Sequence, residues 1–545
     1  MEIAEIRDLD GPNVFMRQPA IKLEIDIRRN EPTVAKGFAD AFAVGATSDD
    51  RRPTQVSVER LTVLLAEVMN VLHDRAGVER PPIVTRLMET PHHVAIAFGW
   101  TNRPFAKRLA RLAFEIVAGT VMDVEREIAE LRLLAAQKLE TDDRPAMLSD
   151  SERHIPIIGI TGTNGKTTTT RLIAAILMGS GKRVGWTSSA GVVVQGETVL
   201  DGDFTGPAGA SRVFEEPDLD VAVLETARGG ILLRGLGYES NDVSVVTNVS
   251  ADHLGLQGVF TVEELARVKR VVAWVTKPEG FAVLNANDPL VYAMREGMRA
   301  RPFLISRHHE NLDVAAHADS GGWALWVENG IVHFSHDGVR EVLTDLNEIP
   351  ITLGGKATHM LENALCAAAA TLALGLDLDQ VRTGLSKFRN RVDQNRGRLN
   401  VFDVAGVTVV VDFAHNAAGL DHLLNVGRGL ATDGGTMIAV VGSAGDRPDD
   451  ALTELGRLAG ERADVVVIKD TIKYLRGRAS GDIPNLILTG TSQARHDDVR
   501  TEPNEFAAFE RSMSLAKPGD AVVIMCIEDI DQILDHLTET GTAIS

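Results

Sequence analysis

Cysteine is scarce in this sequence, and its scarcity already restricts the class of protein. Cys366 and Cys526 are the only cysteines among 545 residues, and they lie far apart. Two such residues cannot supply the disulfide framework of a small secreted domain. Because both lie in apolar surroundings, we predict two buried thiols in a reducing compartment.

Long apolar runs and an excess of positive charge are also missing. No uninterrupted apolar run is long enough to span a membrane, and no signal peptide opens the chain. The formal net charge of −20 argues against a surface that follows nucleic-acid phosphates. We therefore expect a cytoplasmic protein that binds neither a membrane nor a nucleic acid.

The composition is otherwise that of a folded chain with several domains. Hydrophobic residues make up 44% of the sequence, which is enough for sizeable cores, and the length predicts two to four domains. We predict a small α+β domain over residues 1–150, an α/β central domain with a parallel sheet over 151–390 and a Rossmann-like domain over 391–545. Residues 140–153 are charged, contain a proline and lack apolar periodicity, so we place a linker there.

The first unit alternates strand and helix patterns but shows no catalytic constellation. Residues 21–27 and 92–98 predict strands, while 58–72 and 108–134 carry the apolar spacing of helices. The neighbouring His92 and His93 would point to opposite faces of a strand, so a shared metal is disfavoured.

The most informative stretch is Gly159-Ile-Thr-Gly-Thr-Asn-Gly-Lys-Thr-Thr168. An apolar run precedes it and a helical run follows, so it predicts a strand, a glycine-rich turn and a helix. The free N–H groups of such a turn bind phosphate. Lys166 can neutralise the outer phosphates of a nucleotide, and the Thr167 hydroxyl can hold Mg²⁺. The strict phosphate-loop pattern has a glycine where this chain has Ile160, so an ordinary strand-to-helix turn is the alternative.

Polar residues also follow two other predicted strands of the central domain. Glu225 ends the run 220–225, and His253 follows the run 243–249. Sites in α/β sheets gather at the carboxyl ends of parallel strands. We therefore expect Glu225 and His253 at the ends of neighbouring strands, within reach of the Mg²⁺ held by the phosphate loop. An ordinary charge at a strand end is the alternative for Glu225.

The phosphate loop resembles that of the Mur ligases, and more closely that of the Mur-ligase-like half of cyanophycin synthetase. Similar stretches follow in the family's order at 224–231, 248–255, 280–289 and 412–416, and Gly11-Pro12-Asn13 is a weaker match near the start. The chain departs from the family at Met360, inside the counterpart of a His-Asn-x-x-Asn motif, and at Arg396, which replaces a proline. Cyanophycin synthetase also carries an ATP-grasp domain, for which the linker 140–153 leaves no room.

The resemblance implies ATP and Mg²⁺ as cofactors and assigns roles to particular residues. Lys269 would stand where Mur ligases have a carbamylated lysine, Asn363 would meet adenine, and Asp412 would bind the ribose. A solvated helix lysine is the alternative for Lys269, and a residue packed within its helix is the alternative for Asn363. The implied nucleotide-binding residues are Gly162, Thr163, Asn164, Gly165, Lys166, Thr167, Thr168, Asn363, Arg398 and Asp412. The implied metal ligands are Thr167, Glu225 and His253, and the implied catalytic residues are Lys166, Lys269, His253 and Arg398.

The implied activity is ATP-dependent amide formation, as in an acid–amino-acid ligase. The carboxylate of a peptide or small acid would become an acyl-phosphate, and an amino acid or other amine would displace phosphate. The arginine-adding half-reaction of cyanophycin synthetase is of this type. The resemblance also implies a homo-oligomer and an N-terminal domain that holds the acceptor. Two alternatives remain: a P-loop NTPase or phosphotransferase, and a nucleotide-binding scaffold without turnover.

Overall fold

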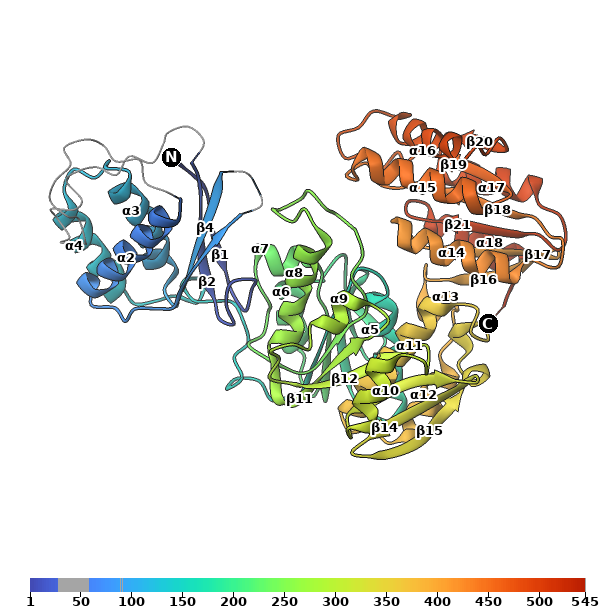
Figure 1. Cartoon of the computed structure of the whole chain (residues 1–545), viewed down its shortest axis with the longest axis horizontal. Coiled ribbons are helices and arrows are strands. Elements are labelled where there is room, and N and C mark those ends of the chain that lie inside the picture. Colours follow the sequence, from blue (N-terminus) through green and yellow to red (C-terminus); the bar gives the residue numbers. More distant parts are fainter. Residues whose placement is uncertain (28–57, 89, 91, 545) are drawn as a thin grey trace.

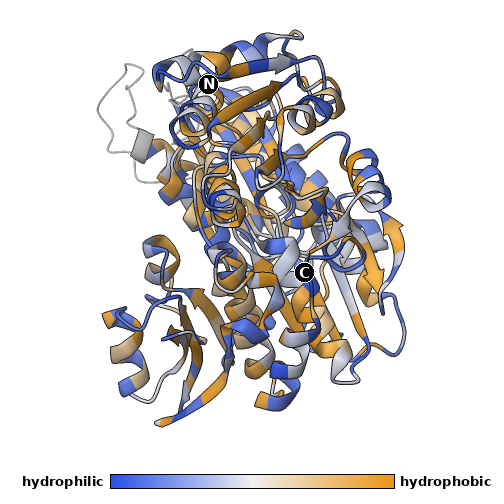
Figure 2. Cartoon of the chain, turned by 90° about the vertical axis from the view of Figure 1, so that its right-hand side faces the viewer, coloured by the Kyte–Doolittle hydropathy of each residue, from blue (hydrophilic) through white to orange (hydrophobic). Residues whose placement is uncertain are grey.

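The computed structural model describes residues 1–27, 58–88, 90 and 92–544. The chain forms three lobes that follow one another in sequence order, each built on a sheet of its own (Figure 1). We call them the N-terminal, central and C-terminal lobes. Hydrophobic colour concentrates on the strands inside the lobes, and hydrophilic colour on the loops and outer helix faces (Figure 2).

The N-terminal lobe is an antiparallel sheet with helices packed on one face. Its strand order is β1 (Glu2–Leu9), β2 (Ala20–Asp26), β4 (His93–Gly99) and β3 (Ile83–Leu87). The helices are α2 (Val58–Ala76), α3 (Arg103–Val117) and α4 (Val124–Ala136), and they share one hydrophobic core with β2 and β4. The expected helical stretch 108–134 is therefore two helices. The chain breaks at Gly119, where φ is +71°, and the Asp123 side chain caps the start of α4.

The central lobe is built on an eleven-stranded sheet of mixed direction. Its seven strands from β13 to β6 are parallel, while hairpin strands run antiparallel at both edges. The order is β15 (Val339–Asp345), β14 (Ile331–His336), β13 (Trp323–Glu328), β12 (Arg301–Ser306), β11 (Thr276–Asn285), β10 (Asn241–Val246), β5 (Ile157–Thr161), β9 (Val221–Glu225), β6 (Val184–Ser188), β7 (Gly191–Val194) and β8 (Glu197–Asp201). The expectation that the strands before Glu225 and His253 are neighbours is wrong, because β5 lies between β9 and β10.

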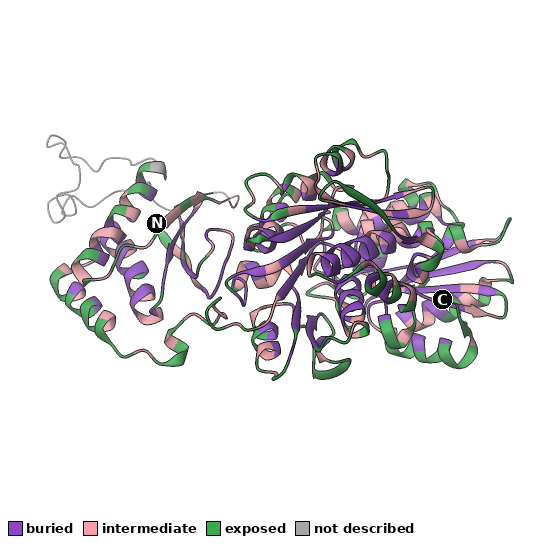
Figure 3. Ribbon diagram, turned by 90° about the horizontal axis from the view of Figure 1, so that it is seen from below, coloured by how far each residue is buried: buried purple, intermediate pink, exposed green. Residues whose placement is uncertain are grey.

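Helices cover both faces of the central sheet, so its inner strands are buried (Figure 3). Side chains alternate between the faces: Ile158 and Ile160 enter one core, and Ile157 enters the other. The first core holds α5 (Lys166–Gly179), α11 (Thr358–Ala373) and α12 (Leu378–Lys387). The second holds α6 (Pro207–Phe214), α7 (Arg228–Leu233), α8 (Val262–Trp274), α9 (Pro289–Ala293) and α10 (Leu312–Asp319). A parallel sheet covered on both faces explains why the strand sequences are continuous apolar runs.

The C-terminal lobe is a second, smaller α/β unit. Its sheet has the order β20 (Val499–Glu502), β19 (Val465–Lys469), β18 (Met437–Val441), β21 (Ala521–Met525), β17 (Val407–Asp412), β16 (Asn400–Val404) and β22 (Thr542–Ala543). Its helices are α13 (Val392–Asn395), α14 (Ala417–Leu430), α15 (Asp449–Arg462), α16 (Asp482–Gln493), α17 (Glu505–Leu515) and α18 (Ile530–Thr540). Buried residues of α14 and α15 belong to the same hydrophobic cluster as α5 and α11, so this cluster continues from the central lobe into the C-terminal lobe.

The N-terminal lobe is fastened to the central lobe by close backbone contact. The N–H of Leu236 donates to the Pro12 carbonyl at 2.8 Å, and a Cβ on Gly11 would come within 1.9 Å of the Leu236 oxygen. Only glycine fits such an approach. The buried Asn13 amide closes the loop by donating to the carbonyls of Gly11 and Gln18. The Gly11-Pro12-Asn13 stretch therefore has a docking role in this fold.

Two simpler expectations can also be compared with the structure. Cys366 and Cys526 are both free and buried, as predicted. Among the described residues, none of the helices combines the length and the apolar character that crossing a bilayer requires.

Candidate active site

A cleft of about 400 Å³ lies between the central and C-terminal lobes, and all of the predicted site residues line it. The central lobe contributes the phosphate loop, the end of β9, the segment 252–257 and one side of α8. The C-terminal lobe contributes Arg398, residues 412–415 and the start of α14. This volume is typical of small-molecule sites.

The phosphate loop is a tight turn whose two inner glycines have no room for a side chain. Gly162 and Gly165 have φ of +154° and +84°; a Cβ would lie 1.9 Å from the Thr247 hydroxyl at the first and 2.1 Å from the Asn363 amide oxygen at the second. The Lys166 ammonium donates to the carbonyls of Gly162 and Thr163 at 3.0 and 2.8 Å. It thereby closes the loop around its own backbone.

The start of α5 leaves backbone donors free for a ligand. The N–H groups of Lys166, Thr167 and Thr168 have no acceptor within the described residues, as expected for the first turn of a helix. All three residues line the cleft. Free N–H groups at the positive end of a helix, beside a lysine, form an anion site.

A buried hydroxyl–carboxylate pair lies at the other side of this turn. The Thr167 hydroxyl donates to a Glu225 carboxylate oxygen at 2.9 Å, and Glu225 is only 3% exposed. Burial raises the pKa of Glu225, and the nearby Lys166 ammonium opposes that rise. Two oxygen ligands of this kind suit a hard divalent cation.

His253 lies in the cleft but does not contact Glu225. Its backbone has a φ of +52°, an uncommon left-handed conformation for a residue with a side chain. The Arg447 guanidinium of the C-terminal lobe donates to its Nδ1 at 2.6 Å. Burial lowers the pKa of His253 to about 4, Asp252 opposes that shift and Arg447 adds to it, so the imidazole is neutral at pH 7. The structure thus brings Thr167 and Glu225 together and turns His253 toward the C-terminal lobe.

Lys269 points into the cleft from the middle of α8. It is 3% exposed, and its side-chain amino group donates to the Gly162 carbonyl at 2.6 Å. Burial and the neighbouring Lys166 hold its pKa well below the ordinary lysine value. The solvated-surface alternative for Lys269 does not describe this side chain.

The remaining predicted residues enclose the cleft from two sides. Arg398 stacks on the Phe413 ring at 4.6 Å, and Asp412 accepts the Leu399 N–H at 2.8 Å. Burial raises the pKa of the Asp412 carboxyl, and Arg398 opposes this. Asn363 packs under the phosphate loop, and its amide lies 3.7 Å from the Met360 sulfur. The family departure at Met360 therefore places a thioether next to the predicted adenine-binding amide.

Sequence reasoning missed the residues that join the two lobes across the cleft. Asn164 of the phosphate loop and Asn416 exchange two amide hydrogen bonds, at 3.2 and 3.1 Å. Asp252 forms an ion pair with Arg447 at 3.2 Å, and its carboxylate lies 3.7 Å from the Nε2 of His415. Asn416 and His415 belong to the family-like stretch 412–416, and Asp252 to 248–255, so these stretches marked the residues without showing their partners.

The sequence of this chain matches the profiles of a known protein family. The sequence profile of the Mur ligase middle domain matches residues 160–371, and that of the Mur ligase glutamate ligase domain matches residues 397–526. A UDP-N-acetylmuramoyl-L-alanyl-D-glutamate–2,6-diaminopimelate ligase of Geobacter metallireducens is 30% identical in an alignment 397 positions long, which covers 68% of this chain and 73% of that one. The chain belongs to the Mur ligase family.

A second relative of this chain is more similar to it in sequence but is a much longer protein. The cyanophycin synthetase of Nostoc sp. (strain PCC 7120) is 39% identical over 395 residues, which are 72% of this chain and 43% of that protein. The chain thus spans less than half of the cyanophycin synthetases that it resembles. A solved bifunctional folylpolyglutamate synthase/dihydrofolate synthase from Yersinia pestis, complexed with AMPPNP and a manganese ion, has a TM-score of 0.51. It is 20% identical and covers 70% of this chain and 89% of its own, so it shares the fold.

The predicted α/β architecture with a small N-terminal α+β lobe is thereby confirmed, and so is the resemblance to the Mur ligases.

The hydrogen-bond donors and oxygen ligands of the cleft also fit the implied cofactors. Unpartnered N–H groups beside Lys166 suit nucleotide phosphates. The Thr167–Glu225 pair supplies oxygen ligands, and no cluster of three or more histidine, cysteine or acidic side chains that could hold a metal occurs within the described residues. A cation here would therefore complete its shell with phosphate and water oxygens.

Proposed function

We propose that this Mur ligase is an ATP-dependent acid–amino-acid ligase. The observation that carries the proposal is the meeting of three features in one cleft. These are a phosphate loop closed by Lys166, the buried Thr167–Glu225 pair, and the amine of Lys269 against the loop backbone. Both relatives are named for their activities, one as a ligase and the other as a synthetase, which supports the same activity class.

ATP and Mg²⁺ are the proposed cofactors. Residues 162–168 would hold the phosphates, Asn363 the adenine, and Asp412 the ribose, with Arg398 reaching phosphate from the C-terminal lobe. Thr167 and Glu225 would hold Mg²⁺, which supplies charge neutralisation at the transferred phosphoryl group. The manganese and AMPPNP in the solved Yersinia pestis relative support a nucleotide–divalent cation pair in this fold.

The proposed reaction forms one amide bond in two steps. A carboxylate oxygen of the acceptor attacks the γ-phosphorus of ATP, the bond to the bridging oxygen breaks, and ADP leaves. The nitrogen of the amine then attacks the acyl carbon, the carbon–oxygen bond breaks, phosphate leaves, and the nitrogen loses a proton. Buried donors aimed at the developing charge lower both barriers.

The chain's own residues exclude water and position the reacting groups. The Asn164–Asn416 pair and the Asp252–Arg447 ion pair hold the C-terminal lobe over the phosphate loop. A closed cleft protects an acyl-phosphate from hydrolysis. The neutral His253 is the proposed catalytic group next to Arg447, and Lys269 is the proposed carbamylated residue, because carbamylation requires an uncharged amine.

We also propose how the chain divides into domains and that it assembles into an oligomer. We propose domains over residues 1–150, 151–390 and 391–545, supported by the separate sheets, and a homo-oligomeric enzyme of the cytoplasm. The N-terminal lobe, docked beside the cleft-bearing lobe, is the proposed holder of the acceptor.

A substrate screen tests the proposed function. Purified protein, ATP and Mg²⁺ are incubated with amino acids paired with acidic peptides or small acids, and ADP release is measured. We expect release only when both a carboxylate and an amine are present, with one mass addition on the acceptor by mass spectrometry. ADP release without an amine would indicate an NTPase or phosphotransferase, and nucleotide binding without release would indicate a scaffold. A ladder of repeated additions would contradict the single bond.

A further inference from the structure

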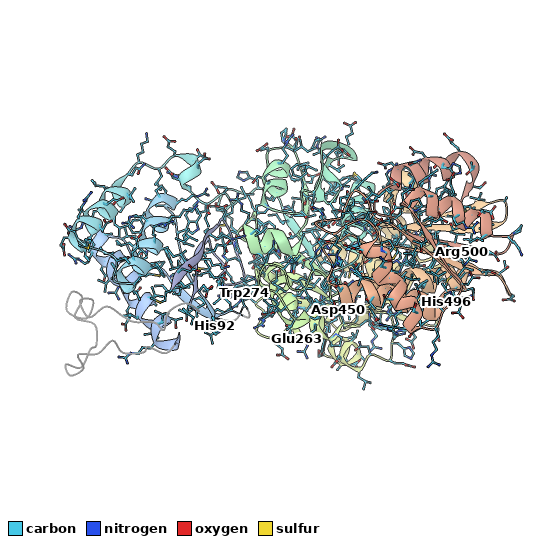
Figure 4. All side chains as sticks on the ribbon, turned by 90° about the horizontal axis from the view of Figure 1, so that it is seen from above. His92, Glu263, Trp274, Asp450, His496 and Arg500 are labelled. Carbon is cyan, nitrogen blue, oxygen red and sulfur yellow. The ribbon has the colours of Figure 1, made fainter. Side chains whose placement is uncertain are left out.

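Arg398 lies in a tightly constrained turn at the start of the C-terminal lobe. Figure 4 marks this lobe by the labelled Asp450 and the central lobe by the labelled Trp274. The two neighbours of Arg398, Gly397 and Leu399, have left-handed φ of +72° and +52°. A left-handed backbone is uncommon for leucine and persists only where the surrounding contacts hold it. The contacts around this turn therefore decide where the Arg398 guanidinium points.

Several hydrogen bonds hold the backbone of the turn within the C-terminal lobe. The N–H of Leu399 donates to the Asp412 carboxylate at 2.8 Å, and the N–H of Phe413 donates to the Gly397 carbonyl at 2.9 Å. The N–H of Gly397 donates to the amide oxygen of Asn400 at 2.7 Å. All these partners belong to the lobe that carries Arg398, so they do not fix the turn relative to the phosphate loop.

Three buried asparagines surround the same turn. We call them the asparagine bracket: Asn390, Asn395 and Asn400, each at most 1% exposed. The Asn395 carbonyl accepts the Arg398 N–H at 3.0 Å, and the Asn395 amide donates to the Arg398 carbonyl at 3.3 Å. The Asn400 amide donates to the carbonyls of Asn390 and Asn395 at 2.8 and 3.2 Å. Asn395 thus holds the Arg398 backbone on both sides.

One side chain of the central lobe connects the asparagine bracket to the helix that follows the phosphate loop. The Arg171 guanidinium on α5 donates to the Asn395 amide oxygen at 3.4 Å and to the Arg396 carbonyl at 3.2 Å. Arg171 lies four residues after Thr167, so the two side chains share one face of α5, about 6 Å apart at their Cβ atoms. The helix therefore fixes the distance between the Thr167–Glu225 pair and the bracket.

Arg171 also interacts electrostatically with Arg398. Burial lowers the pKa of Arg171 to about 10; the charge of Arg398 adds to this shift and that of Glu225 opposes it. Burial also lowers the pKa of Arg398, and the carboxylates of Asp412 and Glu225 oppose that shift. The two oxygens that accept from Arg171 belong to neutral groups, so its positive charge remains. Two buried cations close to the phosphate loop favour a bound anion there.

We propose that Arg171 is a positioning residue of the nucleotide site. It holds the asparagine bracket against α5 and thereby directs Arg398 toward the outer phosphates of ATP. This role rests on the proposed function, in which Arg398 reaches phosphate from the C-terminal lobe. Arg171 does not line the cleft itself, so its effect on a nucleotide passes through Arg398. The effect should therefore depend on the outer phosphates, which AMPPNP carries and AMP lacks.

A purely structural role is the alternative for Arg171. A cation near the carboxyl end of α13 also satisfies the last carbonyls of that short helix. In that case the loss of Arg171 would loosen the start of the C-terminal lobe as a whole. AMP and AMPPNP would then lose affinity together, and the presence of Arg398 would make no difference.

Isothermal titration of the full chain with AMPPNP and with AMP, both with Mg²⁺, tests the proposal. Arg171→Met should weaken AMPPNP binding roughly threefold to tenfold, the effect of about one hydrogen bond, and leave AMP binding unchanged. Arg171→Gln keeps an amide donor and should weaken AMPPNP binding less. Arg183→Met is the matched control, because this exposed arginine of the same lobe also donates to a carbonyl, that of Asp218. It should leave both affinities unchanged.

A double-variant cycle separates positioning from general stabilisation. In a chain that already carries Arg398→Ala, Arg171→Met should cause no further loss of AMPPNP affinity, because the guanidinium that Arg171 directs is absent. Losses that add up in the double variant would show that Arg171 acts independently of Arg398, and the positioning role would be wrong.

Other results would also overturn the proposal. Equal AMPPNP affinities of Arg171→Met and the wild type would exclude it, and so would equal weakening of AMPPNP and AMP. Thermal melting shows whether Arg171→Met folds, and Arg171→Gln replaces it in each comparison if it does not. A wild type that binds no AMPPNP would refute the proposed ATP site together with this role. A wild type that binds AMPPNP no better than the Arg171 variants would refute this role alone.

Discussion

Lys166 is the residue on which the nucleotide site depends most directly. Its ammonium makes two hydrogen bonds, both to carbonyls of its own loop. Lys166→Ala removes the cation that would face the outer phosphates, and loss of one preorganised electrostatic group costs about 10²- to 10³-fold in turnover. We expect this loss in ADP release, with little change in melting temperature. Lys182→Ala, an exposed lysine just beyond the same helix, is the control. Turnover of Lys166→Ala near that of the control would contradict the ATP site.

Lys269 allows a prediction about pH. Its pKa in the folded chain is well below the ordinary value, so at any pH between the folded and the unfolded pKa the unfolded chain binds a proton that the folded chain does not. The free energy of unfolding should therefore rise with pH up to about 10, the unfolded pKa. In bicarbonate-free buffer, the wild type should gain stability relative to Lys269→Met between about pH 7 and about pH 9.5. Urea unfolding measures this, and Lys182→Met is the exposed control. If the free energy of unfolding changed with pH in the same way in the wild type and in Lys269→Met, Lys269 would be charged in the folded chain.

At the scale of elements, the sequence predicted what is local and missed what is not. Apolar runs ending in polar residues located β5, β9 and β10 to within a few residues, because strands buried on both faces leave a continuous signal. The placement of β5 between β9 and β10 depends on pairing between distant segments, which periodicity does not encode. Gly119 is itself a local sign that a helix ends there. Because the helical apolar spacing continues from residue 108 to residue 134, the sequence predicted one helix instead of two.

Glu225 and His253, which we predict from the sequence to bind one metal, follow strands that are not neighbours in the sheet. Glu225 contacts Thr167, whereas His253 contacts Arg447. We therefore expect Glu225→Gln to raise the Mg²⁺ concentration needed for half-maximal turnover by about tenfold or more, because a metal-binding carboxylate becomes neutral. His253→Ala should lower turnover at saturating Mg²⁺ with a smaller effect on Mg²⁺ dependence. Magnesium titrations of both variants measure this. An equal increase of this Mg²⁺ concentration in both variants would show that His253 also binds the metal.

At the scale of the whole molecule, two interfaces hold the three lobes together, and the cleft lies at the second of them. One fastens the N-terminal lobe through Gly11 and Leu236, and the other closes the C-terminal lobe over the phosphate loop through Asn164 and Asn416. Such contacts pair residues more than two hundred positions apart, so no sequence window contains both partners. The stretches that resemble the family contain Gly11 from the first contact and both asparagines of the second, and only the fold shows which residues are partners.

The Asn164–Asn416 pair predicts how closure can be weakened without harming the fold. The Asn416 side chain also caps α14 by accepting the Gly419 N–H, so alanine would remove two functions at once. Asn416→Ser keeps a capping oxygen and removes the amide donor. Each lost hydrogen bond is worth about 0.5–1.5 kcal/mol, so the cleft should open more often.

Small-angle scattering should then give a larger radius of gyration for Asn416→Ser than for the wild type, and ATP hydrolysis should exceed amide formation because water reaches the cleft. Asn425→Ala, on the same helix but exposed, is the control. The double variant with Asn164→Ala should lose little more than either single variant, since each already breaks the shared pair. Additive losses would show that the two amides act separately and that closure rests on the Asp252–Arg447 ion pair instead.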